Sequence, residues 1–331
     1  MKNTERYLPV IPVLVAYAAL LAYGVLIPGK WQIASQLAFY CALGQAFNLF
    51  MGMTGYVDFG YVAFLGVGSY GMALPIYHLS DKGLGLWLIV IGIFLAAVFS
   101  FILSLAVGAV ALRLRGAYFA IATIGVNEGF RFLIEGARIW NGSEGLLFFL
   151  HMRTAFGKQT ATAISNYWAD GMVFAVAIVA AIMTLIYMRN KVGYALTALR
   201  EDEDAAKVMG INVTKYKITA FITSAVLAGI LGGTAWSLKY SYVYPSDVFE
   251  IHYTVEAIII VLLGGAGTLL GPLVGGIIYG VSKYFLAIIL PGFQLLIFAP
   301  VIIAIIVLFP EGTVGMLKKK VIGTPLEKYI I

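Results

Sequence analysis

The chain has 331 residues, of which 61% are hydrophobic and 11% are charged, and its mean hydropathy is +0.94. Soluble domains carry roughly 25% charged residues, so this composition excludes a water-soluble fold, which could not bury so much apolar surface. The net charge of +6 does not indicate nucleic-acid binding, because the basic residues are spread over short loops between apolar segments.

Apolar segments of about twenty residues follow one another along nearly the whole chain. A hydrocarbon layer about 30 Å thick requires about 20 apolar residues per helical span, and these segments lack the alternation of barrel strands. We therefore predict an all-α, polytopic transmembrane helical bundle of about ten spans, with broken or re-entrant helices among them. The predicted spans are Leu8–Ile27, Gln32–Phe50, Tyr56–Tyr77, Leu86–Leu112, Gly116–Glu135, Ala169–Met188, Lys217–Leu238, His252–Leu270, Leu273–Leu290 and Gln294–Phe309.

The first span is expected to be retained rather than cleaved, because it is nearly of spanning length and no small-residue cleavage site follows it before Pro28. Basic residues in the short loops satisfy the positive-inside rule if both termini are cytoplasmic. We expect one domain, 1–331, with an outer loop at 136–168 and an inner loop at 189–216. The largest group of basic residues assigned to the inner side lies in and next to the inner loop: Arg189, Lys191, Arg200, Lys207, Lys215 and Lys217.

Four ionisable residues fall inside the predicted spans: Asp58, Glu128, Arg131 and Glu256. A charge at membrane depth costs several kcal/mol, from about 2.5 kcal/mol upward, so each is a candidate for a solute pathway or its gate. Glu128 and Arg131 are three residues apart on one helix and are expected to form an ion pair. Asp58 and Glu256 lie near span ends, where contact with interfacial water is the alternative to a functional role.

The inner loop has the composition of a surface helix. It contains neither Pro nor Gly from Tyr194 to Met209, and Gly210 then provides a helix stop. The small apolar residues expected on one side of this helix are Leu196, Leu199, Ala205, Ala206 and Met209. A plain solvated connector is the alternative interpretation.

Small residues recur at every fourth position in the C-terminal half of the chain. The sets are Ala225, Gly229 and Gly233, then Gly267, Gly271 and Gly275, then Gly276 and Gly280. This spacing predicts helix faces that allow close backbone approach. The alternative for Gly264, Gly265 and Gly267 is that they interrupt a span so that backbone carbonyls line a solute route.

The inner loop also carries a recognisable pattern. Asp204, Ala205, Ala206 and Gly210 fit the acidic-Ala-Ala, three residues, Gly pattern of the coupling loop in ABC import permeases, with Asp in place of the usual Glu. The whole segment 193–212, GYALTALREDEDAAKVMGIN, resembles the coupling loop of the branched-chain amino acid permeases of the LivM type. The coupling residues that this resemblance implies are Gly193, Ala195, Leu196, Ala198, Arg200, Asp204, Ala205, Ala206, Gly210 and Ile211.

Three further segments resemble the same family: GYVDFGYVAFLGVGSY at 55–70, LRGAYFAIAT at 114–123 and LGGAGTLLGPLVGG at 263–276. The resemblance therefore covers roughly 44–310. One departure is NGSEGL at 141–146, where the family usually has Thr-Gly-Gly before a further Gly-Leu. The resemblance implies that this outer loop faces a binding protein or the pathway entrance, so the departure leaves the solute open.

The resemblance implies a non-enzymatic permease subunit of an ABC importer in a bacterial or archaeal cytoplasmic (inner) membrane. The expected solutes are branched-chain or other amino acids, with urea or a short amide as the alternative. The implied partners are a second, LivH-type permease subunit, two ABC ATPases, an extracytoplasmic solute-binding protein and the lipid bilayer, but no nucleic acid. ATP-driven closure of the ATPases would push the helix Arg200–Gly210 and tilt the spans that it joins.

The chain itself lacks the motifs of an ATPase or a metalloenzyme. Its three histidines, His78, His151 and His252, are scattered, so no metal site is expected. Residues 24–30 fit a phosphate-binding loop, but Trp31 replaces the Ser or Thr that would bind magnesium, so ATP and Mg are expected in partner subunits only. Two alternatives remain. An ion-coupled secondary carrier would be built from an inverted repeat, but the chain shows only weak internal similarity. A membrane enzyme would need clustered catalytic groups, which the sequence does not show.

Overall fold

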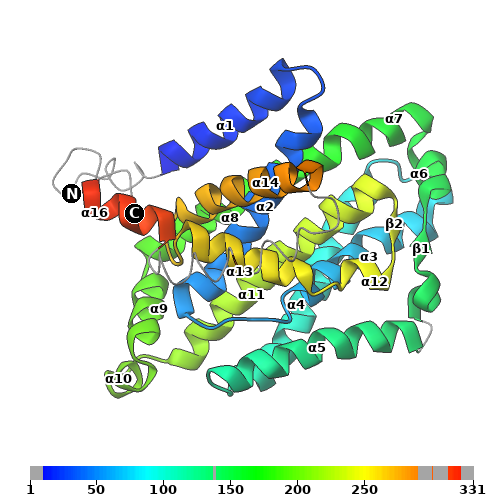
Figure 1. Cartoon of the computed structure of the whole chain (residues 1–331). Helices are drawn as coiled ribbons and strands as arrows, with labels where there is room; N and C mark the ends of the chain where they lie inside the picture. Colours follow the sequence, from blue (N-terminus) through cyan, green and yellow to red (C-terminus); the bar gives the residue numbers. More distant parts are fainter. Residues whose placement is uncertain (1–9, 137–138, 290–299, 301–311, 322–331) are drawn as a thin grey trace. The chain divides into compact units, whose positions relative to one another are not determined.

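The computed structural model describes residues 10–136, 139–289, 300 and 312–321 (Figure 1). The predicted positions of both chain termini and the predicted span Gln294–Phe309 lie outside these residues. In the described part, the strands are one antiparallel pair of two residues each, β1 (Leu146–Leu147) with β2 (Tyr242–Val243), in which Leu146 is opposite Val243. The rest of the regular structure is helical, which confirms the predicted all-α class.

The chain divides into two compact units, and neither is a continuous segment. Unit 1 contains Met1–Gly55, Ala177–Ile211 and Glu256–Ile331, and unit 2 contains Tyr56–Val176 and Asn212–Val255. We predicted one domain without internal division. Because segments of the two units alternate along the sequence, no single linker separates them, and composition gives no signal of a boundary.

Unit 1 is built around two helices that pack through glycine. Helix α14 packs against α2, and a methyl group added at Gly276 or Gly280 of α14 would meet Cys41 or Tyr40 of α2 within 2.8 Å. The predicted close approach at these two glycines is therefore present. Figure 1 shows the two helices in unit 1. The helices of this unit are α1 (Val10–Leu26), α2 (Trp31–Phe47), the π-helical turn η2 (Asn48–Gly52), α9 (Lys191–Glu201), α10 (Glu203–Val208), α14 (Gly271–Ile289) and α16 (Gly312–Val321).

Unit 2 has a core of three long helices, α3 (Val62–Leu79), α4 (Trp87–Ala111) and α11 (Val213–Gly232). A methyl group at Gly68 of α3 would overlap with the backbone of Gly229 in α11, and one at Gly229 would overlap with Ser100 of α4. The predicted small-residue face of α11 therefore lies at a three-helix contact. The remaining elements of unit 2 are η3 (Ser80–Lys82), α5 (Ala117–Gly136), η4 (Ile139–Glu144), α6 (Phe149–Phe156), α7 (Lys158–Ala163), η5 (Ile164–Trp168), η6 (Gly233–Leu238) and α12 (Pro245–Val248).

Two helices begin in unit 2 and end in unit 1, α8 (Ala169–Arg189) and α13 (His252–Gly264). Helix α8 continues α7 and η5, so one apolar helix extends over Lys158–Arg189. This helix therefore begins at Lys158, inside the predicted outer loop at 136–168, and extends the span that we predicted from Ala169.

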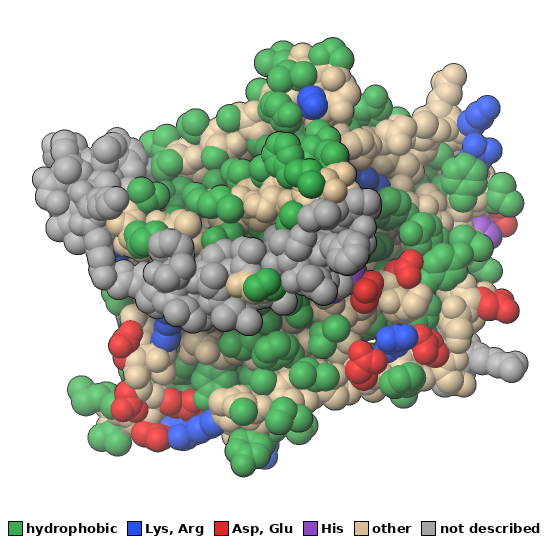
Figure 2. All heavy atoms as spheres, viewed as in Figure 1, with side chains coloured by type: hydrophobic (Ala, Val, Ile, Leu, Met, Phe, Trp, Pro, Cys, Tyr) green, Lys and Arg blue, Asp and Glu red, His purple; other side chains and the backbone are tan. Residues whose placement is uncertain are grey.

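Five helices in the described residues are long and apolar enough to cross a membrane: Val62–Lys82, Trp87–Ala111, Lys158–Arg189, Val213–Leu238 and Gly271–Ile289. The apolar helix α1 is shorter, with 17 residues, and α5 carries Glu128, Arg131 and Glu135. Hydrophobic side chains cover much of the visible helical surface (Figure 2). On α4, for example, Trp87, Phe94 and Val110 are 68%, 65% and 71% exposed, as expected of side chains that contact lipid.

Helix α13 ends earlier than the span we predicted at His252–Leu270. It has 13 residues, which at 1.5 Å per residue gives a length of about 20 Å, less than the roughly 30 Å of a hydrocarbon layer. A non-helical segment, 265–270, follows, with left-handed φ angles of 122° at Gly265 and 76° at Gly267. The glycines thus interrupt the helix, and Gly267 belongs to this break rather than to the helix face that we predicted for Gly267, Gly271 and Gly275.

Candidate functional site

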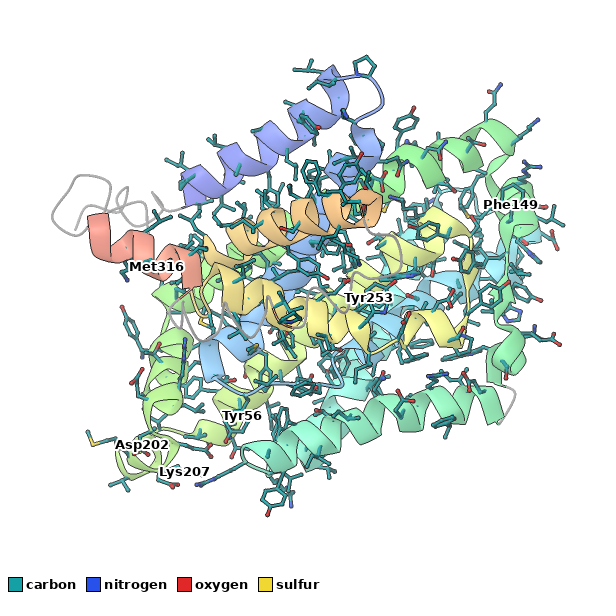
Figure 3. The ribbon with its side chains drawn as sticks, in the orientation of Figure 1. Tyr56, Phe149, Asp202, Lys207, Tyr253 and Met316 are labelled. Atoms are coloured by element: carbon teal, nitrogen blue, oxygen red, sulfur yellow. The ribbon has the colours of Figure 1, made fainter. Side chains whose placement is uncertain are left out.

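The inner loop folds into two short helices instead of the single helix predicted from Tyr194 to Met209. Helix α9 ends at Glu201, and Asp202 adopts an extended conformation with φ −155° and ψ 112°. One carboxylate oxygen of Asp202 accepts hydrogen bonds from the backbone amides of Asp204 and Ala205, both at 2.9 Å. Aspartate is a strong N-cap residue, and capping α10 is favoured over continuing α9. Figure 3 labels Asp202 and Lys207 at this end of unit 1.

Helix α10 stops where the sequence predicts. Gly210 has a φ of 81°, its amide donates to the Lys207 carbonyl at 3.0 Å, and the Ile211 amide donates to the Ala206 carbonyl at 3.0 Å. These two bonds form a Schellman motif, which satisfies carbonyls left free at a helix end. Asn212 then caps α11 by accepting from the Lys215 amide at 3.1 Å. Both ends of α10 are therefore fixed by local hydrogen bonds.

The break at Asp202 changes which side chains are buried. Leu196, Leu199 and Ala206 are buried in unit 1, as predicted, but Ala205 and Met209 are exposed, because the periodicity of α9 does not continue into α10. Val208 and Met209 are 87% and 82% exposed. Of the other predicted coupling residues, Gly193 and Ala195 are buried, Ala198 and Ile211 are half-buried, and Arg200, Asp204 and Gly210 are exposed. We call Ala205, Val208 and Met209 the α10 apolar tip.

Charged side chains surround the α10 apolar tip (Figure 2). Lys207 forms an ion pair with Glu203 at 2.8 Å, one helical turn before it, and lies 4.0 Å from Asp204. Pairs at this spacing are worth about 0.3–0.5 kcal/mol on an exposed helix. The tip is thus an apolar surface of three residues that is bordered by charged side chains.

Replacing Asp202 with alanine is expected to destabilise α10 by about 0.5–2 kcal/mol, because two backbone amides lose their acceptor. Backbone hydrogen exchange in residues 203–209, measured by mass spectrometry, should become faster, while exchange in α9 stays unchanged. Asp202→Asn is the matched control, since asparagine caps a helix as well as aspartate does. Equal exchange rates in the alanine variant and the wild type would contradict this role.

Behind the two short helices, Arg200 contacts the backbone at a helix end and a helix break of unit 1. Its Nη1 donates to the carbonyl of Gly52 at 2.8 Å and to the carbonyl of Ala266 at 3.3 Å. Gly52 is the last residue of η2, and Ala266 lies in the break between α13 and α14. Carbonyls at such ends lack helical partners, so a cationic side chain satisfies them.

Asn48 joins the same two segments from the other side. Its amide nitrogen donates to the Thr268 carbonyl at 3.0 Å, and its oxygen accepts from the Gly267 amide at 2.8 Å. We call Asn48, Gly52, Arg200 and 265–268 the Arg200 junction. Sequence reasoning missed Asn48 and Gly52. A polar Asn within an apolar span was the available signal, but its partner Thr268 is 220 residues away.

The carbonyls of the α13–α14 break are bonded within the chain. Besides Ala266 and Thr268, Gly264 accepts from Thr313 at 3.3 Å, Gly265 from Thr268 at 2.8 Å and Leu269 from Gln45 at 2.8 Å. The sequence offered two roles for Gly264, Gly265 and Gly267, close packing or an interruption of the span whose carbonyls line a solute route. The interruption is present, and Gly264 also packs directly against the backbone of Gly271, whereas the solute route stays a prediction.

The predicted charges at membrane depth are buried or paired rather than exposed to water. Asp58 is 1% exposed, and its carboxylate accepts from the Gly60 amide at 2.9 Å, which stabilises the turn before α3. Glu256 is 4% exposed and accepts hydrogen bonds from Lys283 and, at 3.0 Å, from the hydroxyl of Tyr279. The suggestion that Asp58 and Glu256 reach interfacial water is therefore wrong, because each has an acceptor role inside its own unit.

Glu128 and Arg131 form the predicted ion pair, with 3.6 Å between Arg131 Nη1 and a Glu128 oxygen. Arg131 also pairs with Glu135 at 3.1 Å, which the sequence analysis did not include. All three residues belong to α5. The structure thus places the four predicted charges in three separate local contacts, and the described residues contain no group of three metal-ligating side chains.

Comparisons with known proteins agree with the resemblance of the inner loop. The model of the family "Branched-chain amino acid transport system / permease component" matches residues 31–307. The high-affinity branched-chain amino acid transport system permease proteins LivM of Salmonella typhimurium and Escherichia coli K12 are 30% and 31% identical over 275 and 277 residues. Both alignments cover 77% of this chain and 63% of the relative, so the chain spans less than two thirds of these relatives.

A probable branched-chain amino acid transport permease protein LivH of Methanocaldococcus jannaschii is 32% identical over 145 residues, which are 41% of this chain and 44% of that protein. The high-affinity LivH of Salmonella typhimurium is 23% identical over 286 residues, with 83% and 91% covered. No solved structure matches the chain.

Proposed function

Since the chain belongs to the branched-chain amino acid transport permease family, we propose that it is the translocating permease subunit of an ATP-driven importer of amino acids. The proposed setting is a cytoplasmic (inner) membrane, with both termini in the cytoplasm. The proposed partners are a second, LivH-type permease, two ABC ATPases that bind ATP and Mg, and an extracytoplasmic solute-binding protein.

The observation that carries this proposal is the α10 apolar tip. A short helix that is capped at both ends exposes Val208 and Met209 to solvent. Adjacent exposed apolar side chains do not stabilise the chain itself, but they can contribute to binding when a partner buries them. In the orientation given by the positive-inside rule, this helix lies in the cytoplasm. A partner ATPase with a matching groove would bury these side chains, and α9 and α10 would then receive its movement.

The structure changes the design of the docking experiment. Ala206, which fits the sequence pattern, is buried, so a bulky substitution there would disturb the packing of unit 1. The double substitution Val208→Asp and Met209→Asp alters only exposed side chains. We expect co-purification of the ATPase subunits to fall about tenfold or more, since each buried apolar anchor contributes on the order of 1 kcal/mol or more to such an interface.

Leu150→Asp is the matched control, because Leu150 is 71% exposed but lies on α6, in the predicted outer segment. It should leave ATPase co-purification unchanged. If the double variant retains both the ATPases and uptake, the docking role is excluded.

The substrate requires a separate measurement. Uptake of radiolabelled leucine into proteoliposomes that contain the complete complex and its binding protein should require ATP. Excess isoleucine or valine should compete, whereas urea and acetamide should not. Competition by urea or acetamide alone would favour the alternative of an amide permease from the same family. Accumulation driven by an ion gradient without ATPases would instead establish a secondary carrier.

A further inference from the structure

Arg200 makes side-chain hydrogen bonds that a role in docking alone does not explain. Sequence reasoning grouped it with the residues that meet the ATPase, yet its guanidinium donates to two backbone carbonyls of its own unit, those of Gly52 and Ala266. The two acceptors belong to segments more than 200 residues apart in sequence. Gly52 lies in the last turn of the helix that continues from α2 through η2 to Thr54, and Ala266 lies in the break after α13. One side chain of α9 thus bonds a helix end and a helix break at once.

The surroundings of these bonds leave little space for independent movement. A methyl group at Gly267 would lie 2.6 Å from Arg200 Nη1 and 2.7 Å from the Gly52 carbonyl oxygen, and one at Gly52 would lie 2.6 Å from the Gly267 amide. Asn48 bonds both sides of the break between α13 and α14. Because the backbone atoms are already in contact, a displacement of one segment must move the others.

Helix α9 is also fixed to unit 1 along its own length. Leu196 and Leu199 are buried, and Gly193 packs directly against the carbonyl of Tyr187, where no side chain would fit. Helix α9 therefore does not hang from the unit as a loose connector. At its C-terminal end, Arg200 adds the two hydrogen bonds to Gly52 and Ala266.

We propose that Arg200 is a positioning residue for transport, which ties α9 and α10 to the helix end at 48–52 and the break at 265–270 so that movement of the docked helices displaces both segments together. This inference rests on the proposed function. It assigns to Arg200 a role in transmission inside the permease, distinct from the binding of the ATPase by the α10 apolar tip. The Arg200 junction would move as one body during the transport cycle.

Arg200→Met tests this role, because methionine keeps much of the apolar stem and loses all donors. The complex should still assemble and hydrolyse ATP, but the number of solute molecules imported per ATP hydrolysed should fall at least tenfold. Arg200→Lys retains a charge but lacks the rigid fork of donors, so an intermediate ratio is expected. Thr197→Ala, an exposed position on the same helix whose hydroxyl bonds only its own helix, should keep the wild-type ratio.

An unchanged import ratio in Arg200→Met would overturn the inference. A second result would also overturn it: Arg200→Met loses ATPase binding, while Arg200→Lys binds the ATPases fully and imports as much solute per ATP as the wild type. Arg200 would then only support the docking surface. Failure of the proposed function is a different result, since the wild-type complex itself would then show no ATP-dependent uptake. A decrease in the ratio with assembly intact supports transmission through Arg200.

Discussion

Gly68→Ala should prevent the stable folding of unit 2. The added methyl group would overlap with backbone atoms of Gly229 in α11, and backbone atoms cannot rotate away as a flexible side chain can. Separating α3 from α11 would also disturb their shared contacts with α4. We expect a loss of stability of about 3 kcal/mol or more, at the upper end for overpacked cores. The measurement is the fraction of monodisperse protein after detergent extraction, followed by its thermal unfolding.

Gly125→Ala provides the control for this substitution. Gly125 also lies within a helix, α5, but no atom lies within 4 Å of the position that its Cβ would take. Alanine there should leave the yield unchanged or raise the stability slightly, because glycine is a poor helix former. Normal yield and stability of Gly68→Ala would show that α3 and α11 do not pack as described.

Lys283→Met is expected to destabilise unit 1 by about 3–5 kcal/mol. The Glu256 carboxylate would lose its cation while remaining buried, and breaking one partner of a buried ion pair leaves an uncompensated charge. Tyr279 would still donate to Glu256, which does not replace the lost charge. The midpoint of thermal unfolding of the purified complex should fall accordingly.

Removing both charges tests whether the pair itself causes this effect. Glu256→Gln combined with Lys283→Met leaves no buried charge, so much of the lost stability should return. Lys318→Met on α16 removes an exposed lysine and should change nothing. If the double variant is as unstable as Lys283→Met, an uncompensated charge on Glu256 is not the cause of the lost stability.

Patterns that depend on neighbouring residues could be predicted from the sequence. The helical class follows from apolar segments of spanning length, the end of α10 from Gly210, and the ion pair of Glu128 with Arg131 from their spacing on one helix. The small-residue faces around Gly229 and Gly276 likewise indicated close helix packing. In each case the interacting groups lie within a few residues of each other in sequence, or the pattern repeats along one face of a helix.

Features set by distant partners could not be predicted. Hydropathy showed an apolar segment from His252 to Leu270, and its glycines offered an interruption as one alternative. The hydrogen bonds from Gln45, Asn48 and Arg200 that satisfy the break could not be foreseen, because these residues are distant in sequence. The inward position of Arg200 depends on the same contacts. Asp202 is a different case, since its capping bonds are local, and a run of four acidic residues concealed which of them would cap α10.

The capping of α10 has a thermodynamic consequence for any partner that binds it. A six-residue helix is not stable alone in water, and ordering each residue of a flexible segment costs about 1–2 kcal/mol of conformational entropy. In this chain, the capping bonds of Asp202 and the turn at Gly210 order the helix during folding, so the entropy loss is offset before any partner binds. A partner that meets this preorganised helix therefore retains more of the free energy from burying Val208 and Met209 as affinity.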